Sequence, residues 1–207
     1  MCGKYYADRE FIPRLSTLFK ENDILTDPEL KEEWDKVLYE DSRDVSPTDS
    51  AVTISLSSDG LFASKMKWGF RDPYHDSLVI NARAETAKEK QMFRESVRKR
   101  RCVIPASGYY EWDPAKARYR FRKDDGGLIL LAGIYRSEQG EPRYTILTTQ
   151  ANECMKPVHD RMPVTVSPEE IRPLITDMSA ALGILARRPE ELLRIQDSGQ
   201  ISMELGI

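Results

Sequence analysis

The sequence lacks the features that define several specialised protein classes. Only three cysteines occur among 207 residues, and this odd, sparse set excludes a disulfide scaffold and indicates a reducing cytoplasm. No apolar run is long enough to span a bilayer, and no signal-peptide core lies near the start. We therefore expect a cytoplasmic protein without a membrane partner.

An excess of charge of one sign is also lacking, as are metal ligands. The 31 Lys and Arg residues nearly balance 34 Asp and Glu residues, which leaves a formal net charge of −3. A nucleic-acid binder of high overall basicity is excluded, although a cleft can be positive on an acidic protein. Cys154 and His159 have no second ligand pair nearby, so we expect no zinc site and no cofactor.

The hydrophobic pattern changes its period along the chain. Helical spacing runs through residues 9–39 and returns in 86–100, whereas the polar stretch 41–49 predicts a loop. Strand-like alternation fills the middle of the chain. The predicted strands are residues 51–56, 61–68, 101–105, 108–112, 118–122, 128–135 and 143–149.

Helical signatures dominate the C-terminal third. Pro168-Glu169-Glu170 and Pro189-Glu190-Glu191 each have the composition of a first helical turn. Strands in the middle with helices at both ends predict an α+β fold rather than a βαβ repeat. Because no repeat or linker interrupts the chain, residues 1–207 are expected to form a single domain.

Cys2, directly behind Met1, is the most informative residue. Initiator methionine is usually removed when the second residue is small, so the mature chain would begin with an α-amine and a thiol on one residue. The amine titrates near pH ~8 and the thiol near ~8.5. Such a pair can attack one carbonyl carbon twice, first to form an imine and then a five-membered thiazolidine ring.

Three further segments place reactive side chains beside predicted strands. Taken singly, each has an ordinary interpretation: Asn81 can cap a helix, Glu111 can face solvent, and His159 can be a surface residue. A carboxylate between aromatic residues can instead have its pKa raised by desolvation, which suits proton transfer. The segments are Asn81-Ala82-Arg83-Ala84-Glu85-Thr86, Pro105-Ala106-Ser107-Gly108-Tyr109-Tyr110-Glu111-Trp112 and His159-Asp160-Arg161-Met162-Pro163.

Together with Met1-Cys2-Gly3, these segments resemble the SRAP (SOS response-associated peptidase) family. The resemblance runs in order from residue 2 to about residue 175. It implies a largely antiparallel, strongly curved, barrel-like sheet flanked by helices. The bacterial type is favoured because no sliding-clamp motif or disordered tail is visible at Ile207. Smaller matches are Ser46-Pro47-Thr48, Lys67-Trp68-Gly69-Phe70, Ala132-Gly133-Ile134-Tyr135 and Thr148-Thr149-Gln150-Ala151-Asn152.

The resemblance implies a role at abasic sites in single-stranded DNA, including single-strand/double-strand junctions, as part of the SOS response to DNA damage. Mature Cys2 would form a thiazolidine with the ring-opened abasic sugar, a reversible protein–DNA crosslink that protects the lesion during replication. Asn81 would hold the sugar and orient the Cys2 amine. Glu111 would act as acid and base, and His159 would move the proton of the deoxyribose oxygen. The chemistry is lyase-like, and the protein is expected to be a monomer.

The resemblance also implies DNA contacts made by phosphate binding and base stacking. Arg83 and Arg161 are expected to meet phosphates beside the lesion. A wedge made of Trp68, Gly69 and Phe70 is expected to stack on the neighbouring base, although ordinary core packing is the alternative for Trp68. The remaining candidates are Lys4, Lys67, Pro47 and Thr149; family members commonly carry arginine where this chain has Lys4, so the bidentate fork is lost there.

Two other functions stay open. An N-terminal cysteine with Asn, Glu and His also fits an N-terminal-nucleophile amidohydrolase or a self-processing peptidase, in which the thiol attacks an amide. Alternatively, a non-catalytic reader would bind damaged single-stranded DNA through Trp68, Arg83 and Arg161. Replacing Cys2 separates these functions, because a thiazolidine requires sulfur and a reader does not.

Overall fold

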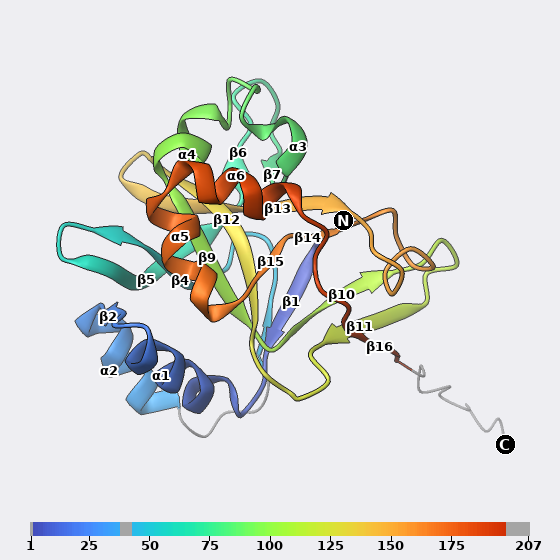
Figure 1. The fold of residues 1–207 in the computed structure, drawn as a ribbon, viewed down its shortest axis with the longest axis horizontal. Coiled ribbons are helices and arrows are strands. Elements are labelled where there is room, and N and C mark those ends of the chain that lie inside the picture. Colours follow the sequence, from blue (N-terminus) through green and yellow to red (C-terminus); the bar gives the residue numbers. More distant parts are fainter. Residues whose placement is uncertain (1, 38–42, 198–207) are drawn as a thin grey trace, which may run out of the picture.

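The computed structural model describes residues 2–37 and 43–197 and confirms the predicted α+β class (Figure 1). The strands are β1 Lys4–Ala7, β2 Leu25–Thr26, β3 Arg43–Val45, β4 Ser50–Ser57, β5 Gly60–Trp68, β6 Phe70–Arg71, β7 Leu78–Val79, β8 Asn81–Arg83, β9 Arg101–Ala106, β10 Gly108–Trp112, β11 Arg118–Arg122, β12 Ile129–Glu138, β13 Glu141–Gln150, β14 Arg161–Pro163, β15 Thr165–Val166 and β16 Leu193–Gln196. The helices are α1 Phe11–Glu21, α2 Pro28–Val37, α3 Ala84–Ala87, α4 Arg94–Lys99, the 3₁₀ helix η1 Pro168–Glu170, α5 Ile171–Thr176 and α6 Met178–Ala186.

Five strands close into a barrel, as the expected strong curvature requires. Strands β13, β12, β9, β4 and β5 are neighbours in that order through antiparallel pairs. The ring closes where β5 pairs in parallel with β13, with Lys67 and Trp68 opposite Arg143 and Tyr144. Strand β8 adds a second parallel pair to β13. The sheet is thus largely antiparallel, with two parallel pairs at β13 and a third between β2 and β5.

A second, antiparallel sheet packs beside the barrel in the order β16-β11-β10-β1-β3. Ser107 alone connects barrel strand β9 to β10 of this sheet, so the chain turns sharply there. A Cβ on Gly108 would lie 2.4 Å from the Tyr6 hydroxyl and 2.6 Å from the Phe121 carbonyl oxygen. Only glycine therefore permits this approach of β10 to β1 and β11.

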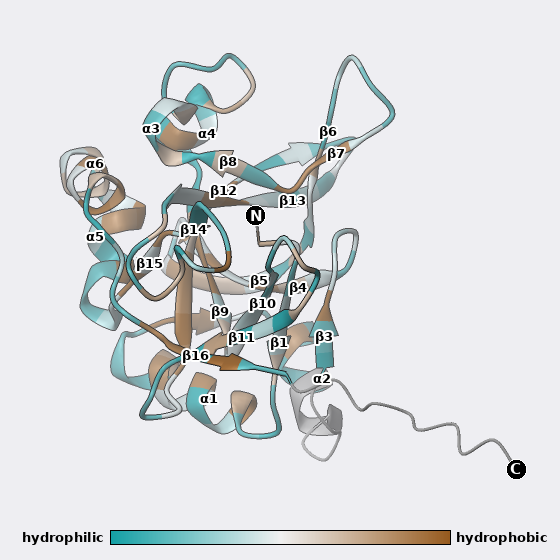
Figure 2. Cartoon of the chain, turned by 90° about the vertical axis from the view of Figure 1, so that its right-hand side faces the viewer, coloured by the Kyte–Doolittle hydropathy of each residue, from teal (hydrophilic) through white to brown (hydrophobic). Residues whose placement is uncertain are grey.

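The barrel has apolar side chains on both of its faces, and they form two clusters. The outer cluster packs α1, α5 and α6 against strands β4, β9 and β12. The inner cluster lies between the barrel and the second sheet and includes Cys2, Tyr5 and Trp68. Figure 2 shows β9 and β12 as hydrophobic strands in the interior. Burial on both faces explains why residues 101–106 form a continuous buried run instead of an alternating one.

Three predictions from the hydrophobic pattern are corrected. The helix expected from Pro189 is wrong, because residues 193–196 pair with β11 as an edge strand. The predicted helix 86–100 is broken into α3 and α4. Buried Ala87 and Phe93 would lie ~120° apart around one continuous helix, wider than the apolar stripe of a typical surface helix. The predicted loop 41–49 contains β3, which pairs with β1.

Several predictions fall on residues 38–42 and 198–207, which lie outside the described part of the chain. They are the end of the N-terminal helical region at Tyr39, the start of the loop at residue 41 and the absence of a tail at Ile207. The extent of the single domain to residue 207 likewise stays a prediction. Within the described residues, no helix is long and apolar enough to cross a membrane.

Candidate active site

Cys2 lies just before β1 and is almost entirely buried, with 1% of its surface exposed. Burial raises the pKa of its thiol well above the usual range, and the negative charge of Glu111 raises it further. The sulfur also makes a weak contact with the Lys4 carbonyl oxygen at 4.0 Å. The thiol is therefore protonated at neutral pH, and a base must remove its proton before it attacks as a thiolate.

Asn81 contacts Cys2 directly. Strand β8 runs beside β13 with Asn81 opposite Ile146, and the Asn81 Nδ2 donates to the Cys2 carbonyl oxygen at 2.8 Å. Its Oδ1 is buried without a hydrogen-bond partner among the described residues. The helix-cap interpretation is wrong, since Arg83 holds the N-cap position of α3. Asn81 therefore fixes the Cys2 backbone and keeps one unused acceptor inside the site.

Trp68 binds the backbone next to Asn81. Its indole Nε1 donates to the carbonyl oxygen of Ile80 at 3.0 Å, one residue before Asn81. The ring is fully buried, stacks on Tyr144 with centroids 6.2 Å apart and lies 5.2 Å from the Tyr5 ring. The hydroxyls of these two tyrosines are 2.6 Å apart. The rings of Tyr5, Trp68 and Tyr144 pack in the same cluster as Cys2, and we call these three rings the aromatic floor of the site.

The predicted stacking wedge is therefore corrected for two of its three members. Trp68 and Phe70 both have 0% exposure. The pairing of β5 with β13 places Trp68 in the barrel wall, and Phe70 packs against Phe93 at the start of α4. Gly69 between them is also buried, with φ +102°, where a Cβ would lie 3.3 Å from Leu78 Cβ. The side chains of Trp68 and Phe70 cannot stack on a base in this conformation.

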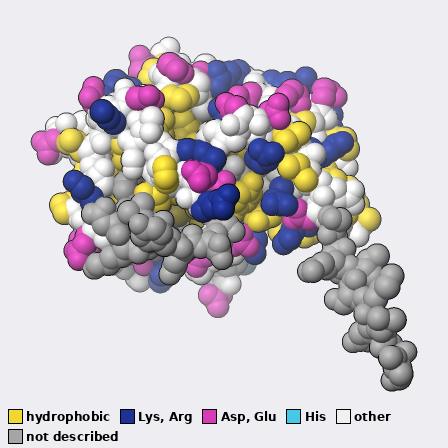
Figure 3. Space-filling model, turned by 90° about the horizontal axis from the view of Figure 1, so that it is seen from below, with side chains coloured by type: hydrophobic (Ala, Val, Ile, Leu, Met, Phe, Trp, Pro, Cys, Tyr) yellow, Lys and Arg dark blue, Asp and Glu magenta, His cyan; other side chains and the backbone are white. Residues whose placement is uncertain are grey.

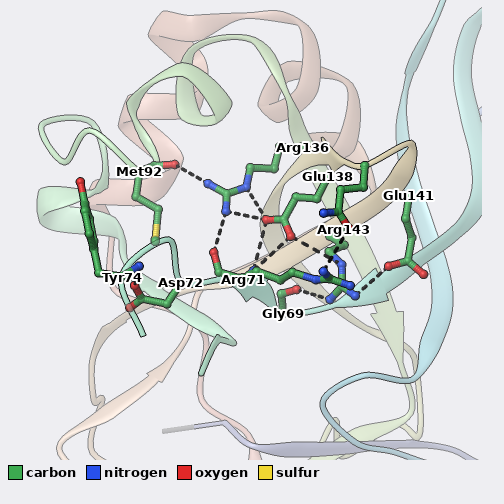
Figure 4. Close-up of polar contacts among 10 residues, drawn as sticks. Gly69, Arg71, Asp72, Tyr74, Met92, Arg136, Glu138, Glu141 and Arg143 are labelled. Atoms are coloured by element: carbon green, nitrogen blue, oxygen red, sulfur yellow. Dashed lines mark hydrogen bonds and ion pairs between the residues drawn. The ribbon is translucent and has the colours of Figure 1, made fainter. Parts of the chain in front are cut away.

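A buried ionic network holds the backbone at Gly69 (Figure 4). The guanidinium of Arg143, 3% exposed, donates to the Gly69 carbonyl oxygen at 2.9 Å. The same group pairs with Glu141 at 2.7 Å and with Glu138 at 3.6 Å. A buried arginine needs such partners to offset desolvation. The network thus fixes the chain directly after Trp68.

Glu111 points into the same site from β10. The residue is 3% exposed, so the solvent-facing interpretation is wrong; Glu111 shares the inward face with Tyr109, whose ring stacks on Phe121. Burial raises the pKa of the Glu111 carboxyl, and the positive charge of His159 partly opposes that rise. The carboxyl is thus electrostatically coupled both to the Cys2 thiol and to the histidine.

His159 lies at the rim, in the segment between β13 and β14, with its side chain 28% exposed. Its Nδ1 accepts a hydrogen bond from the Arg161 backbone N–H at 2.9 Å. In the neutral ring this acceptor role places the proton on Nε2. Asp160 Oδ1 lies 2.8 Å from the same Nδ1, and it accepts a hydrogen bond from that nitrogen only when Nδ1 carries a proton. The ring therefore has a defined partner in each charge state.

Two arginines lie on either side of the end of β13. Arg83 on β8 pairs with Thr148, and Arg161 on β14 pairs with Gln150. Arg83 is exposed, whereas Arg161 donates to both carboxylate oxygens of Glu85, at 3.0 and 2.9 Å. Burial alone would raise the pKa of Glu85, but the hydrogen bonds and charge of Arg161, together with hydrogen bonds from the Glu85 backbone and Thr149, lower the pKa. The guanidinium of Arg161 is therefore already paired with one carboxylate, that of Glu85.

The remaining predicted DNA contacts are spread along the neighbouring strands. Thr149 donates to Glu85 at 3.1 Å and belongs to the Arg161 group. Lys4 pairs with Asp44 at 2.7 Å, and Lys67 pairs with Glu141 at 3.0 Å. Pro47 is half-buried in a loop that β5 holds, because the Thr48 N–H donates to the Trp68 carbonyl oxygen at 3.0 Å. Lys67 thus shares its partner Glu141 with Arg143.

Sequence reasoning missed Tyr109. Its hydroxyl is buried without a hydrogen-bond partner among the described residues, and burial, with the charges of Cys2 and Glu111, raises its pKa well above the usual range. The available signal was the alternation along β10, which places Tyr109 on the face that carries Glu111. Across residues 2–37 and 43–197 no three His, Cys, Asp or Glu side chains are grouped to hold a metal ion.

Comparison with known proteins assigns the fold and the family of this chain. A model of the family described as "SOS response associated peptidase (SRAP)" matches residues 1–196. The abasic site processing protein YoqW of Bacillus subtilis is 34% identical over 184 residues, which cover 82% of this chain and 77% of that protein. The abasic site processing protein YedK of Escherichia coli is 28% identical over 182 residues, covering 83% and 78%. A crystal structure of a protein from Bordetella bronchiseptica is similar in fold, with a TM-score of 0.73 at 20% identity over 94% of this chain and 99% of that one.

Proposed function

This chain belongs to the SOS response associated peptidase (SRAP) family, and we propose that it processes abasic sites in DNA by forming a covalent crosslink through Cys2. The names of its relatives support the class of substrate. One structural observation supports the chemistry most directly: Asn81 binds the backbone of Cys2 while the charge of Glu111 acts on the thiol of the same residue. The site therefore gathers an amide and a proton-transfer group around one N-terminal nucleophile.

The reaction begins with removal of Met1, which turns the backbone nitrogen of Cys2 into a free amine. The amine attacks the C1′ aldehyde of the ring-opened abasic sugar, a C–N bond forms, and one water leaves to give an imine. The thiol sulfur then bonds to the same carbon while its proton passes to the imine nitrogen. The product is a thiazolidine, and the overall loss is one water molecule.

The side chains around Cys2 divide the proton transfers between them. Glu111, whose pKa is raised by burial, accepts the proton of the attacking amine and returns it to the departing hydroxyl. His159 at the rim protonates the sugar oxygen and so opens the closed hemiacetal. The unused Oδ1 of Asn81 accepts a hydrogen bond from the Cys2 amine and directs its lone pair toward the aldehyde.

DNA binding next to the lesion is assigned to the two arginines beside β13. Arg83 is exposed and meets a flanking phosphate directly. Arg161 meets the other phosphate by exchanging Glu85 for it, a swap between two oxyanions of similar geometry. Single-stranded DNA and single-strand/double-strand junctions fit this role, because contacts of this kind read the backbone rather than the base sequence.

A denaturing gel tests the proposal. Purified protein with a confirmed free Cys2 is mixed with a single-stranded oligonucleotide that carries one abasic site. We expect a heat-stable shifted band whose intact mass equals protein without Met1 plus DNA minus one water. Cys2→Ser and a chain with one extra residue before Cys2 should give no such band. Absence of any covalent product from the unmodified protein would refute the crosslinker and favour the amidohydrolase.

A further inference from the structure

The outer face of the second sheet carries basic and aromatic side chains that the proposed reaction does not use. Arg118, Arg120 and Arg122 occupy alternate positions of β11 and therefore point to one side of the sheet, opposite to the buried Phe121 between them. This side of β11 is open to solvent: the Arg118 and Arg120 side chains are 46% and 45% exposed. These two arginines are accessible to a ligand.

Neighbouring strands extend this set of side chains. Trp112 lies opposite Arg118, and Tyr110 lies opposite Arg120 on one side and Lys4 on the other. The guanidinium carbon of Arg118 is 5.1 Å from the Tyr110 ring centroid, and the Trp112 ring is 6.4 Å from it. Trp112 is 40% exposed, unusual for so large an apolar side chain. We call this set the outer basic face: Lys4, Tyr110, Trp112, Arg118, Arg120 and Arg122.

The outer basic face is positive on a chain whose net charge is −3. Asp197 pairs with Arg118 at 2.8 Å and with Arg120 at 2.7 Å, and Asp44 pairs with Lys4. Four cations thus face two carboxylates. In the view from below, Lys and Arg side chains lie interspersed with hydrophobic and acidic ones (Figure 3). Cations beside an exposed aromatic ring match the chemistry of a single-stranded nucleic acid, which offers phosphates and unpaired base faces.

The outer basic face begins next to the proposed reaction site. Glu111 and Trp112 are consecutive on β10, so one points into the site and the other onto the outer face. Lys4 is two residues from Cys2, a distance of ~7 Å along a strand. Successive arginines of β11 are also ~7 Å apart, about the axial rise of two stacked nucleotides. A DNA strand that leaves the lesion and passes around the end of β10 at Trp112 can therefore follow β11 on the outer face.

We propose that the outer basic face binds the single-stranded DNA that flanks the lesion. Arg118 and Arg120 contact phosphates two nucleotides apart, which replace Asp197 as their partner, and Trp112 stacks on an unpaired base. The inference rests on the proposed function only in placing the lesion at Cys2. Binding to undamaged single-stranded DNA is a property of this face alone.

The test is a salt series of binding to an undamaged, fluorescently labelled single-stranded oligonucleotide of about 20 nucleotides. Each phosphate contact contributes ~0.7 to the slope of log K against log salt for single strands, so Arg118→Gln/Arg120→Gln should flatten the slope by ~1.4. The matched control is Lys20→Gln/Lys31→Gln, two exposed lysines on α1 and α2, with the same change in net charge and no expected change in slope. Trp112→Ala should weaken binding about tenfold.

An unchanged slope and affinity in Arg118→Gln/Arg120→Gln, or an equal change in the lysine control, would overturn the proposal. Crosslinking at saturating abasic DNA should proceed at the unmodified rate in the arginine variant, because neither arginine touches the reacting atoms. If the unmodified protein binds undamaged DNA but never crosslinks abasic DNA, the proposed function fails while the outer basic face is still tested. Thermal melts of all variants verify that each is folded.

Discussion

We predict that the indole of Trp68 positions Asn81 for the proposed reaction without contacting the DNA, and Trp68→Phe tests this. The substitution keeps an aromatic ring in the floor but removes the N–H that binds the Ile80 carbonyl oxygen. The Ile80 carbonyl oxygen keeps its other hydrogen bond, from the Ile146 N–H at 3.1 Å, so the change removes one of two bonds, at a cost of ~0.5–1.5 kcal/mol. For a chain of this size each kcal/mol lowers Tm by ~2–4 °C, and we therefore expect a fall in Tm of about 1–6 °C from this loss.

The same loss should slow the chemical step, because Asn81 follows Ile80 directly and holds the Cys2 backbone at 2.8 Å. If about 1.4 kcal/mol of positioning is lost, the crosslinking rate at saturating abasic DNA falls about tenfold, with little change in the DNA concentration at half-maximal rate. The assay is single-turnover crosslinking followed on denaturing gels over a range of DNA concentrations.

Tyr144→Phe is the matched control for this experiment. It breaks the buried hydroxyl contact with Tyr5 and so destabilises the same floor, but leaves the Trp68–Ile80 bond in place. Its saturating rate should match that of the unmodified protein even where its Tm falls. Equal rate losses in the Trp68 and Tyr144 variants would show that stability alone, not the position of Asn81, sets the rate, and the reasoning would be refuted.

Three further predictions follow from individual contacts. Glu85→Gln should tighten DNA binding several-fold in a polarisation titration, because it frees Arg161 from a competing carboxylate; weaker binding would contradict an exchange of Glu85 for phosphate. Burial raises the pKa of Glu111 above its unfolded value of ~4.3. Below pH ~4 the carboxyl is protonated in both states, so Glu111→Gln should be as stable as the unmodified protein in thermal melts. As pH rises from the unfolded to the folded pKa, the unmodified protein should lose stability relative to Glu111→Gln. Gly108→Ala should lower stability by ~1–3 kcal/mol, since its Cβ would lie 2.4 Å from the Tyr6 hydroxyl; an unchanged Tm would contradict that constraint.

The strands were predictable from sequence because their signals are local. Alternation along residues 108–112 and 118–122 gave the bounds of β10 and β11 as the structure has them. The absence of a helix at Pro189 could not be predicted from the sequence. An acidic turn after proline is a local signal for a helix, whereas the strand is formed by pairing of residues 193–196 with β11, which is distant in the sequence. The same limit applies to β3, whose partner β1 lies almost forty residues away in the sequence.

The candidate site was predictable as a set of residues but not as an arrangement. Nothing local distinguishes a solvent-facing Glu111 from a buried one, because both obey the same alternation. Trp68 illustrates the opposite error: an aromatic residue beside a candidate site resembles a base-stacking side chain, yet closure of the barrel through β5 and β13 buries it completely. Only the three-dimensional ring closure decides between the two roles.

In the proposed reaction, the raised pKa of the Cys2 thiol favours the amine as the first of the two nucleophiles to act. A thiol whose pKa is raised by burial and by the Glu111 charge stays protonated at neutral pH, so it competes poorly for the aldehyde. The amine therefore attacks first. The retained thiol proton is what the imine nitrogen needs when sulfur closes the ring, so the second step requires no proton from solvent. A buried, protonated thiol beside an amine thus suits a thiazolidine-forming protein and would hinder a peptidase that needs a thiolate from the start.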